Sequence, residues 1–171
     1  MINPQYEHSK FGLWMFNLCA RWTIFLSKHR LLYYILAFTW GALMTILGLI
    51  ITVILCVLKL FVKSITFKKY HWIYYISVGP AYWGGIEIGL MFLRDHASRD
   101  SCINAHEFGH TFQNTLLGPL FIFLVAIPSA ARYWIREIFP SANKTPYDSF
   151  WAEDAASQCG KYIDNYLNNK E

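Results

Sequence analysis

The hydrophobic pattern is dominated by one stretch, Leu31 to Leu58, that contains no charged residue. In a helix such a stretch extends about 42 Å, because each residue adds 1.5 Å, whereas the hydrocarbon core of a bilayer is about 30 Å thick. The pattern predicts one tilted transmembrane helix, assigned with its flanks to residues 31–63. A helical hairpin that turns near Gly41 or Gly48 is the alternative, but no Pro, Asn or Asp marks a turn there.

The segment before this stretch, Phe11 to Ser27, is apolar and aromatic but carries Asn17 and Arg21 near its centre. A charge at mid-bilayer is costly. We therefore expect this segment to lie along the membrane interface, or to pack with Arg21 facing a partner, and not to cross by itself. Residues 1–30 are accordingly predicted to contain an interfacial amphipathic helix.

Two runs rich in aromatic and β-branched residues follow, Tyr70 to Ser77 and Ile86 to Leu93. In the second run apolar side chains recur with a period of two, which is typical of a strand. Gly79-Pro80 and Gly84-Gly85 separate the two runs. Together they predict a short β-hairpin or small sheet, with a third apolar helix as the alternative.

The remaining pattern is helical with interruptions. Residues 111–131 are uncharged and are broken by Gly118-Pro119 and by Pro128-Ser129. Such a segment is expected either to dip into or cross the bilayer, or to form a buried core helix. Residues 147–167 carry an apolar stripe at helical spacing. We assign residues 70–171 to one compact region that follows the membrane segment.

Composition strengthens the membrane interpretation. Apolar residues make up 55% of the chain and aromatic residues 18%, above the roughly 45–50% apolar content of soluble domains. The net charge is +4, and the basic residues flank apolar segments, which suits lipid headgroups better than nucleic acid. Because more lysines follow the uncharged stretch than precede it, the downstream region is expected to face the cytoplasm. The four dispersed cysteines predict free thiols.

The clearest chemical motif is His106-Glu107-Phe108-Gly109-His110. Two histidines four residues apart on a helix share one face, so their imidazoles can bind a single cation. A carboxylate beside them can take a proton from a zinc-bound water that attacks a carbonyl, and H-E-x-x-H is therefore read as a metallohydrolase signature. A structural metal site or two ordinary histidines are the alternatives.

A catalytic zinc site usually has three protein ligands and a water. No histidine follows His110, so we expect the third ligand to be a downstream acid. The candidates are Asp148, Glu153, Asp154 and Asp164. Glu153 is preferred because it lies near the start of the predicted final helix, beside an apolar face that can pack on the motif helix. Asp154, about 100° around the same helix, is the second choice.

The motif followed by a glutamate on a later helix resembles the gluzincin group of zinc metallopeptidases, particularly membrane-embedded members such as the CAAX prenyl proteases. The H-E-[FY]-G-H-T-x-Q core is similar to that of small bacterial membrane proteins. The segments that carry this second likeness, about the C-terminal half of the chain, are His106 to Gln113, Leu117-Gly118-Pro119-Leu120, Pro128-Ser129 and Tyr147-x-Ser149-Phe150-x-x-Glu153.

The resemblance implies a mostly α membrane protein in which a transmembrane helix precedes a zincin-like core, in the plasma membrane of a bacterium. It implies that His106, His110 and Glu153 bind zinc and that Glu107 is the general base. The substrate would be a peptide or a membrane-proximal protein segment, paired by its backbone with an edge strand over Gly85 to Leu93.

One position departs from the gluzincin pattern. Gluzincins commonly carry an acid four residues after the glutamate ligand, where it supports a metal-binding histidine, and here that position is Ser157. Asp148, Asp154 or a carbonyl group would have to replace it. Weaker zinc binding or loss of activity is therefore a consequence to test.

Three functions follow from these residues: a membrane-anchored zinc metallopeptidase, a non-catalytic membrane protein with a structural or vestigial metal site, and an intramembrane protease. The third requires an aspartate ligand on another transmembrane segment, and no later acid lies in an apolar span. Candidate donors to the oxyanion are Tyr147, His71 and Arg132. Cys102 is either an alternative ligand or a small buried residue.

Overall fold

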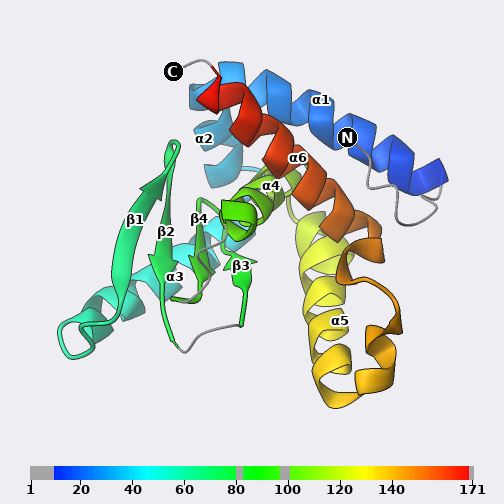
Figure 1. Ribbon diagram of the computed structural model, residues 1–171. Helices are drawn as coiled ribbons and strands as arrows, with labels where there is room; N and C mark the ends of the chain where they lie inside the picture. Colours follow the sequence, from blue (N-terminus) through cyan, green and yellow to red (C-terminus); the bar gives the residue numbers. More distant parts are fainter. Residues whose placement is uncertain (1–9, 80–82, 97–100, 170–171) are drawn as a thin grey trace.

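The computed structural model describes residues 10–79, 83–96 and 101–169 of the chain. This part is mostly helical with a small mixed sheet of four strands, which confirms the coarse fold prediction. Helix α4, Ser101–Leu117, lies in the middle of the molecule. The sheet lies on one side of it, and helices α1, Lys10–Lys28, and α6, Trp151–Asn168, lie on the other (Figure 1).

The first predicted helix is confirmed as α1. It packs on α6 and α4 through one buried stripe made of Met15, Cys19, Thr23, Leu26 and Ser27. Arg21 is exposed, as are Phe11 and Trp14. The helix is therefore amphipathic in three dimensions, with one face in the core and another that carries both a charge and large apolar side chains.

The prediction of a single helix over Leu31 to Leu58 is wrong. The structure has two helices, α2 at Arg30–Phe38 and α3 at Ala42–Lys59, and the chain changes direction between them (Figure 1). By length and composition, α3 is the one helix in the described ranges that could cross a membrane. The turn lies near Gly41, where the alternative placed it.

Contacts with α4 explain the break, which the local sequence does not mark. The amide of Gly41 donates to the carbonyl of Leu36 at 2.8 Å and closes the end of α2. Gly41 lies so close to Asn114 that an added Cβ would be 3.2 Å from its side-chain oxygen. The indole of Trp40 donates to the carbonyl of Leu116 at 3.3 Å. The end of α4 thus separates the two helices.

The strands are β1, Thr66–Tyr70, β2, Ile73–Ser77, β3, Gly85–Glu87, and β4, Met91–Arg94. Their order in the sheet is β1-β2-β4-β3. β1 pairs antiparallel with β2, β2 pairs parallel with β4, and β4 pairs antiparallel with β3. The prediction of a small sheet is therefore confirmed, and β3 is one of its edges.

The expected single strand over Gly85 to Leu93 is corrected to two strands. β3 and β4 form a hairpin, and the chain turns at Gly89, whose φ of +82° is readily adopted only by glycine. A carboxylate oxygen of Glu87 accepts the amide of Gly89 at 2.7 Å and fixes the turn. The period of two was a correct strand signal, but it did not reveal the turn.

Residues 111–131 do not form one membrane-inserted segment. Residues 111–117 complete α4 and are mostly buried, and Gly118, with φ of +55°, ends the helix. The chain continues through π-helical Ile122–Ala126 into α5, Ile127–Ile138. The exposed apolar side chains from Leu120 to the end of α5 are Leu120, Phe123, Leu124, Ile127, Trp134, Ile135 and Ile138. Within residues 111–131, only the part that follows Gly118 is exposed enough to contact a membrane.

Candidate metal centre

Two helices bring the motif histidines and the predicted acid together. On α4, an added Cβ on Gly109 would clash with the carbonyl oxygen of Ala156 on α6. One on Gly160 of α6 would clash with the carbonyl oxygen of Ala105. Both glycines allow the two backbones to touch, with the motif histidines beside the first turns of α6. The glycine within H-E-F-G-H is thus required by packing.

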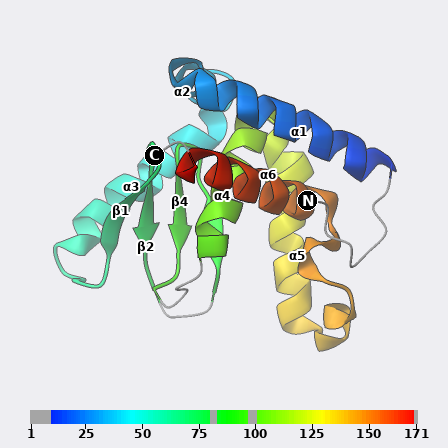
Figure 2. The ribbon, with the colours of Figure 1, turned by 45° about the horizontal axis from the view of Figure 1, so that its top comes forward.

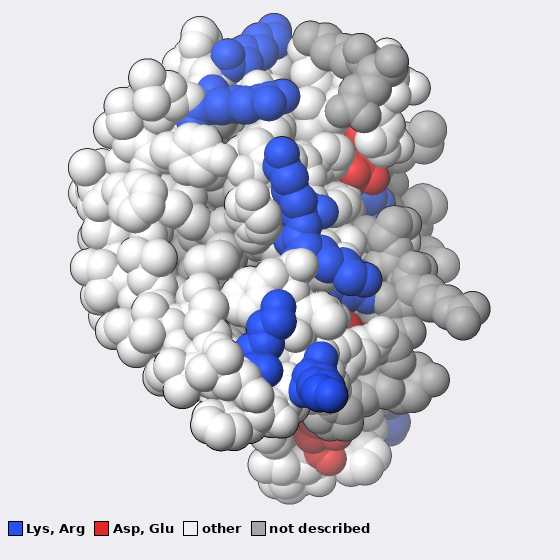
Figure 3. Space-filling view, turned by 90° about the vertical axis from the view of Figure 1, so that its left-hand side faces the viewer, with Lys and Arg blue, Asp and Glu red and all other residues white. Residues whose placement is uncertain are grey.

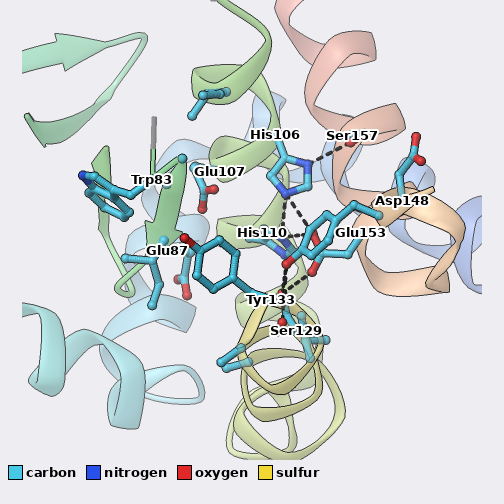
Figure 4. Close-up of a pocket in the computed structure, with 18 of the residues that line it drawn as sticks. Trp83, Glu87, His106, Glu107, His110, Ser129, Tyr133, Asp148, Glu153 and Ser157 are labelled. Carbon is cyan, nitrogen blue, oxygen red and sulfur yellow. Dashed lines mark hydrogen bonds and ion pairs between the residues drawn. The ribbon is translucent and has the colours of Figure 1, made fainter. Parts of the chain in front are cut away.

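Three ligand atoms form a compact triangle at this crossing (Figure 4). The Nε2 atom of His106 lies 3.0 Å from Oε2 of Glu153, and Nε2 of His110 lies 3.6 Å from it. The two Nε2 atoms are 3.1 Å apart. Ligands about 2.0–2.2 Å from a tetrahedral ion lie about 3.4 Å from one another. His106, His110 and Glu153 can therefore hold a metal ion.

The outer nitrogen of each imidazole has a hydrogen-bond partner. Nδ1 of His106 lies 2.8 Å from the hydroxyl of Ser157, and Nδ1 of His110 lies 2.8 Å from Oε1 of Gln113. Because the amide nitrogen of Gln113 donates to the carbonyl of Ala152 at 2.8 Å, its oxygen is oriented to accept. A proton on Nδ1 leaves Nε2 free for a metal, which is the tautomer inferred from this network.

These contacts answer the question raised by the gluzincin pattern. Ser157 itself occupies the supporting position, and a neutral hydroxyl stands where an acid was expected. Gln113 was not identified as a site residue from the sequence, although it is the last residue of the motif core. Its position three residues after His110 was the available signal.

Glu153 is almost completely buried, at 1% exposure. The hydroxyl of Ser129 donates to its Oε1, and Tyr147 Oη lies 3.0 Å from the Ser129 hydroxyl. Its other oxygen, Oε2, faces the imidazoles. Burial alone would raise the pKa of Glu153, but His110 and His106 hold it below its usual range. The carboxylate is therefore ionised and available as a ligand.

The pKa of His110 shifts in the opposite direction, above its usual value. Burial alone would lower its pKa, but the carboxylate of Glu153 outweighs burial and raises the pKa of His110 to about 9. Without a metal, the buried imidazole of His110 is consequently protonated beside the ionised carboxylate of Glu153. A metal cation has to replace this proton when it binds.

Glu107 lies on the β3 side of the imidazoles, whereas Glu153 approaches from α6 (Figure 4). Glu107 is buried, and its burial raises its pKa more than His106 and His110 lower it. A Cβ added to Gly85 of β3 would lie 2.7 Å from the carboxylate of Glu107. Glycine at this point lets the edge strand and the predicted base share one wall of the site.

Glu87 is an acid that sequence reasoning did not select. It is 3% exposed, and its Oε1 accepts hydrogen bonds from the Gly89 amide and, at 3.2 Å, from Asn114. Its Oε2 has no hydrogen-bond partner among the described residues. Burial raises the pKa of Glu87 well above its ordinary value. An acid within an apolar alternating run was the only sequence signal.

The site opens into a cavity of about 860 Å³ between β3, α4 and α5. Tyr147 lines this cavity, as do the apolar side chains of Trp83, Phe121, Val125 and Tyr133. It therefore has room for a substrate that is larger than a single amino acid.

The other two residues predicted as oxyanion donors, His71 and Arg132, do not line this cavity. His71 is paired with Asp164 at 2.8 Å, and Arg132 donates to the carbonyl groups of Pro146 and Tyr147 at 2.7 and 3.0 Å. Cys102 lines the cavity but is outside the group of potential metal ligands.

No family model matches this sequence, and no curated protein or solved structure is significantly similar to it. The geometry of the chain's own residues is thus the evidence for its function.

Proposed function

We propose that this chain is a membrane-associated zinc metallopeptidase, in which His106, His110 and Glu153 bind zinc and Glu107 is the general base. The observation that supports it most is the convergence of two Nε2 atoms and one carboxylate oxygen, within 4.8 Å of one another, beside a second buried carboxylate. Zinc suits this set because it binds imidazole and carboxylate in tetrahedral sites with one position open for water.

Zinc bound there would act as a Lewis acid toward a peptide carbonyl and would lower the pKa of a water. Glu107 is placed to accept a proton from that water and to pass it to the leaving amine. Burial raises the pKa of Glu107, which makes its carboxylate a stronger proton acceptor than an exposed one. Tyr147, which lines the cavity, is a candidate hydroxyl donor for the developing oxyanion.

The substrate would be an extended peptide or a membrane-proximal protein segment. β3 is an edge strand, and its Gly85 lies beside Glu107. An added strand can pair with such an edge through its backbone, which would carry a peptide bond past the base. The exposed apolar surface of α3 supports association with a membrane. The resemblance suggests a bacterial plasma membrane, and the lysines that follow the apolar stretch suggest its cytoplasmic side.

Zinc content and cleavage, measured on the same samples, test this function. Wild-type protein should bind one zinc per chain and cleave unstructured peptides, and Glu107→Gln should keep the zinc while cleavage falls by at least about 10²–10⁴-fold. Equal thermal unfolding of the two proteins is the control for folding. Retained cleavage in Glu107→Gln would rule out its role as base.

A non-catalytic metal-binding protein is the second candidate, because Ser157 replaces the acid that usually supports a zinc ligand. It predicts zinc in both proteins and no cleavage by either. An intramembrane protease is less consistent with the site, since the third ligand position is taken by Glu153 of α6 and not by an aspartate of a second apolar helix.

A further inference from the structure

We propose that the apolar segment formed by α2 and α3 enters one leaflet of an anionic membrane and returns to the same side, so that α3 lies along the membrane and does not cross it. This placement rests on the membrane association proposed above, but not on catalysis. The basic residues beside the segment, which we call the basic row, are Arg30, Lys59, Lys63, Lys68 and Lys69.

α3 is attached to the molecule by one narrow side. A Cβ added to Gly48 would clash with the carbonyl oxygen of Ile88, and one added to Gly89 would clash with the backbone of Thr45. Nine apolar side chains on the rest of the helix are 42–63% exposed, and they are Leu43, Ile46, Leu47, Leu49, Ile50, Val53, Ile54, Val57 and Leu58. A continuous apolar surface of this extent marks a site of contact with a membrane or a partner.

The basic residues before and after the apolar segment contact the same small hairpin. The guanidinium carbon of Arg30 lies 4.8 Å from the ring of Trp72, at the turn between β1 and β2. The ammonium group of Lys59 lies 4.9 Å from the ring of Phe67 in β1. Each strand of this hairpin has five residues, which corresponds to a length of about 17 Å.

A crossing segment would need its two charged flanks about 30 Å apart, on opposite sides of the hydrocarbon core. Arg30 and Lys59 are instead held at one short hairpin. Moving one of them across the bilayer would require the hairpin to enter the hydrocarbon with exposed Lys68 and Lys69 in β1, which is strongly unfavourable. The attachment to the sheet therefore favours a segment that returns to its own side.

The positive charge beside the apolar segment indicates that the lipid headgroups it contacts are anionic. Figure 3 shows Lys and Arg side chains in a row over β1 and the neighbouring ends of α2 and α3, beside a broad surface without charged side chains. No acidic residue occurs between positions 10 and 86. Basic side chains that border an apolar helix match the phosphates of anionic lipids when the helix is inserted at the level of the acyl chains. In Figures 1 and 2, α3 passes behind the strands and α2 lies beyond the ends of the strands at the β1–β2 turn.

Cysteine labelling tests on which side each flank lies. Lys28→Cys and Lys63→Cys are introduced separately into the full chain, after exposed Cys56 and Cys102 have been replaced by serine. Spheroplasts and inside-out vesicles are then treated with a membrane-impermeant maleimide. Both cysteines should react in the same preparation only. Reaction in opposite preparations, or no reaction of either cysteine, would overturn the proposed placement.

Binding to vesicles of different composition tests whether the protein prefers anionic lipid. The full-length protein is floated with vesicles of phosphatidylcholine, alone or mixed with phosphatidylglycerol, and the anionic mixture should bind more protein. At low salt, Lys68→Gln/Lys69→Gln should weaken this binding about 25-fold, or fivefold for each lysine. The matched control is Lys10→Gln/Lys144→Gln, which removes the same charge elsewhere and should have a smaller effect.

Equal losses in the two double variants, or no preference for anionic vesicles, would contradict a basic row that contacts lipid. A dimer that forms without lipid and protects Cys56 from maleimide would assign the apolar surface to a second copy of the chain. Neither assay measures peptide cleavage, so failure here is distinguishable from failure of the proposed enzymatic function.

Discussion

The contact between α4 and α6 and the contact between α3 and the sheet use the same packing feature with different results. In both, glycine lets two backbones touch: Gly109 and Gly160 at the first contact, Gly48 and Gly89 at the second. The first contact buries the neighbouring side chains and holds the three ligand atoms 3.0–3.6 Å apart. The second buries one narrow stripe and leaves a long apolar surface exposed. Close backbone contact therefore positions ligands in one place and attaches a surface helix in the other.

Among the substitutions that test this difference, Gly160→Ala should have the largest effect on zinc binding. The added methyl group would clash with the carbonyl oxygen of Ala105, so α6 must move away from α4 and carry Glu153 out of the ligand triangle. Overpacking of this kind costs about 1–3 kcal/mol of unfolding free energy. We expect loss of stoichiometric zinc, measured by metal analysis, together with a lower midpoint of thermal unfolding. Normal zinc content would show that the helix contact does not set the site.

Ser157→Ala and Ser157→Asp should have an intermediate effect, in opposite directions. The alanine variant removes the partner of His106 Nδ1 and should weaken zinc binding about 10–100-fold in a chelator competition. The aspartate variant supplies the acid that gluzincins commonly have and should bind zinc at least as tightly as wild type. Unchanged affinity in the alanine variant would mean that Ser157 does not orient the imidazole.

Gly48→Ala should have the smallest effect on the site, although its clash with the Ile88 carbonyl resembles that of Gly160→Ala. It should lower the unfolding free energy by about 1–3 kcal/mol because α3 shifts on the sheet. Zinc affinity should stay within a factor of a few of wild type, since α3 provides no ligand. A loss of zinc equal to that of Gly160→Ala would show that the two contacts are coupled.

The parts of the site that follow from local periodicity could be predicted. His106 and His110 share a face because they are four residues apart on a helix. Glu153 could be chosen because no later histidine is present and the final helix has an apolar face. Ser129 and Gln113 could not be assigned roles in the same way, because their contacts depend on how α5 and α6 pack on α4.

The break between α2 and α3 has the same explanation. The uncharged stretch has no turn signal strong enough to end a helix, and Gly41 alone is tolerated in helices. Its contact with Asn114 comes from a residue more than seventy positions later. Hydrophobic patterning therefore gave the apolar character of this segment correctly and its continuity wrongly.

X-ray absorption at the zinc edge, on the zinc-loaded full-length protein and on Glu153→Ala, tests the central claim most directly. We predict nitrogen and oxygen ligands at about 2.0–2.2 Å in the wild type, with two imidazoles, and a lost or changed zinc signal in the variant. A sulfur ligand at about 2.3 Å, or identical spectra and zinc content in the two proteins, would contradict a centre formed by His106, His110 and Glu153.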